Sequence, residues 1–163
     1  MQRAMLMQSL SGGASGVYLL QMTGRLEEEL DPEVFAGAWQ CVVNRHDALR
    51  ASIDWAASSP RQVFADRVDV PFHYIDLSKT DTAEHEAMWD AFIAEDRAQG
   101  FDIAAPPLMR VTLMRLAEAC FRFSWTVHHA VVDGRSLVFV LREVFEVYEA
   151  LRQGERVEPA PAR

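Results

Sequence analysis

The sequence is poor in cysteine, in positive charge and in long apolar runs. Its 163 residues include only Cys41 and Cys120, whose positions give no metal-ligand spacing, so we expect reduced, buried thiols in a cytoplasmic protein. The formal net charge is −8, which argues against a nucleic-acid phosphate backbone as a partner. No apolar run reaches the roughly 18 residues that suggest a membrane span. These absences leave an acidic globular protein.

Half of the residues are apolar, which is enough for one domain with a core or for half of a larger domain. Residues 1–10 are rich in methionine and leucine and lack a small-residue cleavage site, so they predict a short helix and no signal peptide. The glycine- and serine-rich residues 11–16 predict a break after that helix.

Along the rest of the chain, apolar residues recur at the spacing of strands in some stretches and of helices in others. Asp31 before Pro32 predicts a helix start, and Gly100 predicts the end of a second helix whose acidic residues face outward. The side chains expected to face inward in that second helix are Ala87, Trp89, Phe92 and Ile93. The predicted strands cover residues 17–27, 49–55, 61–66, 71–77, 107–117 and 120–130, and the predicted helices cover 32–49, 82–98 and 134–154. This irregular mixture predicts the α+β class, a mixed α/β sandwich with helices packed on a mixed sheet.

Two adjacent histidines, His128 and His129, end an apolar strand, and Asp133 and Gly134 follow at a fixed distance. Side chains alternate between the faces of a strand, so His129 is expected to continue the apolar face and His128 the polar face. An imidazole in a partly dry cleft titrates near neutrality, which suits proton transfer, so His129 is the candidate catalytic residue. Gly134 is expected to leave the backbone open to a ligand.

Each of these residues also has a purely structural interpretation. A buried histidine is more often a satisfied core residue than a catalyst. Asp133 lies at a strand-to-helix turn, where the role of N-cap is as well supported as a functional role. If its carboxylate instead faces inward, it needs a cationic partner, for which Arg45 and Arg50 are the candidates. Those arginines have their own alternative, which is to complement the dipole of a helix C-terminus. The combination of histidines, spacing and Asp-Gly shifts the balance towards a functional site.

Several stretches of the chain resemble one protein family. HHAVVDG at residues 128–134 resembles the HHxxxDG motif of condensation domains of nonribosomal peptide synthetases, which belong to the chloramphenicol acetyltransferase-like superfamily. RHDALR at 45–50 resembles the family's RHxxLR motif, and MQRAMLMQSL at 1–10 resembles its first motif. GFDIAAPPLMRVTLMRL at 100–116 resembles its FDLxxxPLxR segment, and residues 15–46 resemble its first strand and helix.

The sequence departs from the family pattern at Ala4, where glycine is common, and at Arg135, where tryptophan is frequent. It also stops where the second lobe of the family should begin. The resemblance therefore implies a chloramphenicol acetyltransferase-like N-terminal lobe over residues 1–153, followed by the start of an inter-lobe linker at residues 154–163.

The resemblance implies amide-bond formation between a carrier-bound acyl or peptidyl thioester and the amine of a carrier-bound aminoacyl thioester. Both substrates would be tethered to phosphopantetheine on carrier proteins, with no cofactor bound directly by this chain. The implied partners are peptidyl and aminoacyl carrier proteins, the missing C-terminal lobe and neighbouring synthetase domains. No metal is expected, because adjacent histidines on opposite strand faces do not share one ion. The resemblance also implies a substrate tunnel between the two lobes. The isolated lobe is expected to be inactive, since it forms only one wall of that tunnel and water would enter.

The family motif also implies residue roles. His129 would be catalytic, either as general base or as the group that holds the attacking amine and stabilises its charge. His128 would be a supporting residue, and Gly134 would leave room near the substrate tunnel. Asp133 would be structural and paired to an arginine of the 45–50 stretch.

Other functions stay open. A coenzyme A-dependent acyltransferase would share the motif, although residues 1–10 and 45–50 favour a synthetase. A non-catalytic lobe, degenerate or devoted to carrier-protein binding, is the alternative from a different class. Within the family, Gly134 favours the condensing form over an epimerising one, and His128 stands where the heterocyclising branch carries aspartate.

Overall fold

The computed structural model describes residues 18–54 and 59–157. The strands and helices predicted within these ranges are present, although the helix predicted over residues 32–49 ends at Arg45 and the strand predicted over residues 120–130 ends at His128. The predicted helix over residues 1–10 lies outside the described ranges. The elements in chain order are β1 (Leu19–Leu26), α2 (Pro32–Arg45), η1 (Asp47–Arg50), β2 (Ala51–Asp54), β3 (Arg61–Phe64), β4 (Phe72–Asp76), η2 (Thr82–Glu84), α3 (His85–Gln99), β5 (Met109–Ala117), β6 (Cys120–His128) and α4 (Gly134–Arg152).

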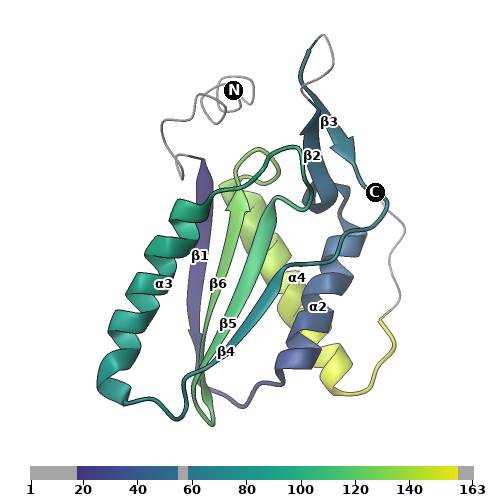
Figure 1. Ribbon diagram of the computed structural model, residues 1–163. Coiled ribbons are helices and arrows are strands. Elements are labelled where there is room, and N and C mark those ends of the chain that lie inside the picture. Colours follow the sequence, from purple (N-terminus) through teal and green to yellow (C-terminus); the bar gives the residue numbers. More distant parts are fainter. Residues whose placement is uncertain (1–17, 55–58, 158–163) are drawn as a thin grey trace.

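The main sheet has the strand order β1-β6-β5-β4 (Figure 1). β6 pairs antiparallel with both β1 and β5, whereas β4 pairs parallel with β5. Parallel neighbours need a crossover connection, and α3 lies in the segment that joins β4 to β5. β2 and β3 form a separate antiparallel hairpin. The sheet is therefore mixed and the α+β class is confirmed.

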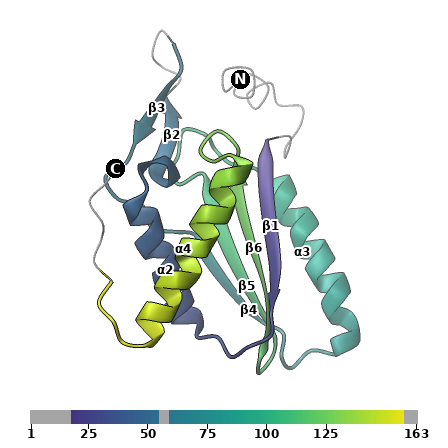
Figure 2. The same cartoon turned by 180° about the vertical axis from the view of Figure 1, so that it is seen from behind.

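Helices cover both faces of the sheet. α2 and α4 pack on one face and α3 lies on the other (Figures 1 and 2). Trp39 of α2 contacts Trp125 of β6, with ring centroids 5.0 Å apart. The apolar residues of β6 that share this core with α2 and α4 are Phe121, Phe123, Trp125 and Val127, as the alternation predicted.

Local sequence signals set the helix ends. The Asp31 side chain accepts hydrogen bonds from the backbone N–H groups of Glu33 and Val34, at 2.9 and 3.2 Å, so it caps α2 as predicted. Gly100 ends α3 with a φ of 63°, a conformation that glycine adopts without a steric penalty. Two expectations for α3 are wrong, because Ala87 is exposed and the acidic Asp96 is only 7 % exposed.

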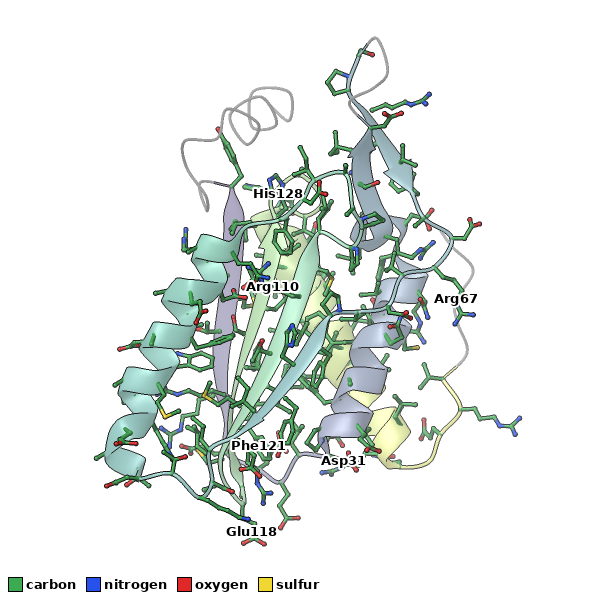
Figure 3. All side chains as sticks on the ribbon, viewed as in Figure 1. Asp31, Arg67, Arg110, Glu118, Phe121 and His128 are labelled. Carbon is green, nitrogen blue, oxygen red and sulfur yellow. The ribbon has the colours of Figure 1, made fainter. Side chains whose placement is uncertain are left out.

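The fold places the histidine motif at one end of the main sheet. His128 and Arg110 lie towards this end and Glu118 lies at the other (Figure 3). The β2–β3 hairpin packs beside the motif, since Ile53 of β2 forms a small buried cluster with Ile103 and Ala130. The Ile53 N–H also donates to the Ile103 carbonyl at 2.8 Å. Three chain segments therefore meet around the residues that follow His128.

Candidate active site

The loop between β6 and α4 is fastened to both neighbouring strands. The backbone N–H of His128 donates to the Leu108 carbonyl at 2.9 Å, and that of His129 donates to the Tyr18 carbonyl at 2.7 Å. The N–H of Val131 then donates back to the His128 carbonyl at 3.1 Å, which closes a turn. The two histidines thus stand where the sheet ends and the loop begins.

His128 is the more deeply buried of the two histidines, with 4 % of its surface exposed. Its Nδ1 accepts a hydrogen bond from the Ala130 N–H at 3.1 Å, so this nitrogen carries no proton in the neutral ring. Burial lowers the pKa of His128 below its ordinary value, and the charge of His129 lowers it further. His128 is therefore a neutral imidazole that helps to shape the turn.

This lowered pKa predicts a pH-dependent stability. Below about pH 6.5 the unfolded chain takes up a proton that folded His128 accepts only at lower pH, so the free energy of unfolding should fall on acidification. Urea unfolding at about pH 7.5 and about pH 5.5 measures the loss. His128→Gln, which has no titrating ring, should lose less over the same interval. Equal losses in wild type and variant would contradict the assignment.

His129 is half-buried and its ring is oriented by the loop. Its Nδ1 lies 2.8 Å from the Val132 carbonyl oxygen. A carbonyl only accepts hydrogen bonds, so Nδ1 carries the proton and Nε2 holds the lone pair in the neutral ring. A general base needs this arrangement: one nitrogen anchored by the protein and the other able to accept a proton.

The expected burial of the two histidines is reversed in the structure. His128 is the buried ring and His129 the partly exposed one. The reason is that β6 ends at His128, so the alternation of faces does not extend to the next residue. The face opposite the core is also covered, because Ser124 and Thr126 on that face are buried.

The predicted pairing of Asp133 with Arg45 or Arg50 is wrong. Asp133 is exposed and caps α4, accepting a hydrogen bond from the Ser136 N–H at 2.7 Å. Hydrogen bonds from Ser136 hold the pKa of Asp133 below its ordinary value. The helix terminus offers this carboxylate nearby N–H donors at its own turn, so the local N-cap interpretation is the correct one.

This correction gives a test by substitution. Asp133→Asn should keep the thermal unfolding midpoint close to that of wild type, because asparagine caps helices about as well as aspartate. Asp133→Ala should lower the midpoint, since it removes the acceptor of the Ser136 N–H. If Asp133→Asn were as damaging as Asp133→Ala, the charge rather than the cap would be important.

The two arginines bind elsewhere. Arg45 forms an ion pair with Glu143 of α4 at 2.9 Å, and the His46 ring lies 2.6 Å from the same carboxylate. Burial raises the pKa of Glu143, but the hydrogen bonds from His46 and Arg45 outweigh it, so the pKa lies below its ordinary value. Arg50 is buried and pairs with Asp47 at 2.6 Å. Residues 45–50 therefore join α2 to α4 and the hairpin, and they do not reach the carboxylate of the motif.

Comparisons with known proteins show the family of this chain. The family model of the condensation domain matches residues 1–163. The chain belongs to the condensation domain family. It is 38 % identical over 159 residues to one of the proteins that make up the linear gramicidin synthase of Brevibacillus parabrevis, and 32 % identical over 165 residues to bacitracin synthase 1 of Bacillus licheniformis. These alignments cover 97 % and 99 % of this condensation-domain chain but only 2 % and 3 % of the two synthetases.

Solved condensation domains have the same fold. The starter condensation domain of rhizomide synthetase RzmA superposes with a TM-score of 0.85 at 25 % identity, covering 97 % of this chain and 39 % of that one. The first condensation domain of the calcium-dependent antibiotic synthetase, in complex with a substrate analogue, gives 0.85 at 24 %, covering 98 % and 38 %. The chain thus spans about two-fifths of these condensation domains, and the chloramphenicol acetyltransferase-like fold is confirmed.

The surface around the motif of this condensation-domain chain is hollowed on one side. A cavity of about 230 Å³ is bordered by η1, the motif loop and α4, with Leu49, Val132 and Phe139 in its wall. Gly134 opens α4, and a Cβ built there would meet no atom within 4 Å, so the space beside this residue is open. A larger hollow of about 900 Å³ lies along β4 and α3, where Asp96 and Arg110 are part of its wall.

Three structural findings bear on cofactors, membranes and thiols. Among residues 18–54 and 59–157, no group of three or more His, Cys, Asp or Glu side chains is placed to hold a metal ion. Within the same described ranges, no helix combines the length and the apolar character of a membrane span. Cys41 and Cys120 are free thiols, as predicted, but both are half-buried rather than buried.

Sequence reasoning missed a charged cluster beside the motif. Asp96 of α3, Arg110 of β5 and Thr126 of β6 meet on the sheet face opposite the main core. Asp96 was detectable, because it continues the helical stripe that begins at Trp89 and Ile93, which places it on the inward face. Arg110 lies in the strand predicted over residues 107–117, but no partner was predicted for its side chain.

Proposed function

We propose that this chain is the N-terminal lobe of a peptide synthetase condensation domain that forms an amide bond between two carrier-bound thioesters. In this proposal residues 1–153 make the lobe and residues 154–163 begin the inter-lobe linker. α4 ends at Arg152, and Val138 and Phe139 near the motif are 61 % and 70 % exposed. Large exposed apolar side chains of this kind support a face that a second lobe covers.

The proposed reaction joins an acyl or peptidyl donor to an aminoacyl acceptor. The acceptor amine attacks the thioester carbon of the donor, a C–N bond forms and the C–S bond breaks. His129 Nε2 accepts the proton that the nitrogen loses and returns it to the leaving thiolate, so no co-reactant is consumed. Phosphopantetheine is here a part of each substrate, carried by a carrier protein and not by this chain.

The orientation of the His129 ring carries the proposal. The Val132 carbonyl anchors Nδ1 at 2.8 Å, which leaves the Nε2 lone pair for the amine. His128, held neutral by burial, would keep the turn in shape without adding a second charge. The test is a condensation assay in the complete domain with two loaded carrier proteins and the His129→Ala variant.

A further inference from the structure

A buried carboxylate ties three neighbouring strands to α3 next to the motif. Asp96 of α3 is 7 % exposed. Its Oδ1 binds the Arg110 guanidinium of β5, and its Oδ2 accepts hydrogen bonds from Thr126 of β6 and, at 2.8 Å, from Gln21 of β1. We call these four residues the Asp96 cluster. β1, β6 and β5 are adjacent in the sheet, so one side chain of α3 holds all three.

Arg110 binds the C-terminal end of α3 as well as the Asp96 carboxylate. Its Nη1 donates to the Gly100 carbonyl at 2.8 Å, its Nη2 donates to the backbone carbonyl of Asp96, and its guanidinium carbon lies 4.4 Å from the centroid of the Phe101 ring. The planar guanidinium thus binds two backbone carbonyls and one carboxylate at the point where α3 stops. Lysine has a single nitrogen and does not reproduce this geometry.

The Asp96 cluster lies close to the motif, because Thr126 precedes His128 by two residues on β6. Thr126 is paired across the sheet with both Gln21 and Arg110. Two residues further along β6, the His128 N–H donates to the Leu108 carbonyl, which itself lies two residues before Arg110. The cluster therefore holds β6, at whose end the two histidines lie, in register with β1 and β5.

We infer that the Asp96 cluster is a positioning device for His128 and His129. Burying an ion pair costs desolvation energy, and apolar side chains would often be as stable, so stability alone does not explain its place. Fully partnered polar groups instead fix one geometry, and a base displaced by about 1 Å can lose up to about 100-fold in rate. This inference rests on the proposed function for its effect on rate, but its effect on the histidine rings does not.

The test replaces members of the Asp96 cluster and observes the histidine rings. In Asp96→Asn, the imidazole NMR signals of His128 and His129 should shift in the folded 163-residue chain. In the complete domain, turnover per folded molecule should fall about tenfold. Thr126→Val keeps the ion pair and removes only the hydroxyl, so it serves if Asp96→Asn does not fold. It should shift the same signals and lower turnover about threefold.

A second ion pair between α3 and the main sheet supplies the control. Arg122 of β6 binds Glu86 near the start of α3, at the opposite end of both elements from His128. Glu86→Gln should leave both imidazole signals and turnover unchanged, even where it lowers stability. Folded Asp96→Asn or Thr126→Val with wild-type signals would overturn the inference. If the wild-type domain showed no turnover, the proposed function would be refuted. The comparison of the imidazole NMR signals would still test whether the Asp96 cluster positions the two histidines.

Discussion

His129→Ala in the complete domain is expected to lower the rate of amide formation by about 10²- to 10⁴-fold, the range that general acid–base groups contribute. The variant removes the ring whose Nδ1 is bound by the Val132 carbonyl and whose Nε2 faces the chemistry in our proposal. A half-buried side chain at the start of a loop contributes little to the core, so the fold should persist. Steady-state product formation with two loaded carriers measures the effect.

A matched variant separates catalysis from a general effect of losing a histidine. His73 of β4 is exposed and lies outside the motif, so His73→Ala should leave turnover unchanged. Circular dichroism and thermal unfolding should show both variants folded. Turnover of His129→Ala within about threefold of wild type would favour the non-catalytic alternative, a lobe devoted to binding carrier proteins.

The second large effect concerns the lone chain. Residues 1–163 by themselves are expected to form product at least about 10³-fold more slowly than the complete domain. His129 is half-buried within this chain, and in our proposal a second lobe excludes water and holds the two tethered substrates against each other. The same assay, run with this chain alone and then with the proposed second lobe added, measures the difference.

Recovery on mixing is the informative outcome. If the two parts associate, product formation should rise with the concentration of the added part and saturate. The His129→Ala chain supplies the control, because it should associate equally well and restore nothing. Turnover by the lone chain at the rate of the complete domain would show that one lobe suffices, and the two-lobe account would then be wrong.

Short-range signals in the sequence were sufficient for most of the elements. Asp31 before Pro32 caps α2, Gly100 ends α3, and the apolar alternation of β6 gives its core face, all as predicted. Each of these features depends on residues within one or two turns of the chain. The strand order and the parallel pairing of β4 with β5 depend instead on contacts between distant segments, which periodicity does not encode.

The errors at the site have different origins. The burial of His128 and His129 was reversed because one residue at the end of β6 decides which ring follows the strand pattern. Asp133 was expected to reach an arginine, but the N–H groups of α4 lie closer in the chain. Asp96 was placed outside with the other acids of α3, although its partners on three strands provide the compensation that a buried carboxylate needs.

In our proposal, His129 presents its Nε2 lone pair to the attacking amine. Imidazole NMR of the complete domain, titrated with an aminoacyl pantetheine amide that cannot transfer its acyl group, tests this contact directly. We predict that the Nε2 resonance of His129 moves with saturation while the ring signals of His128 stay in place. A bound ligand that leaves His129 unchanged, or that moves only His128, would contradict the account.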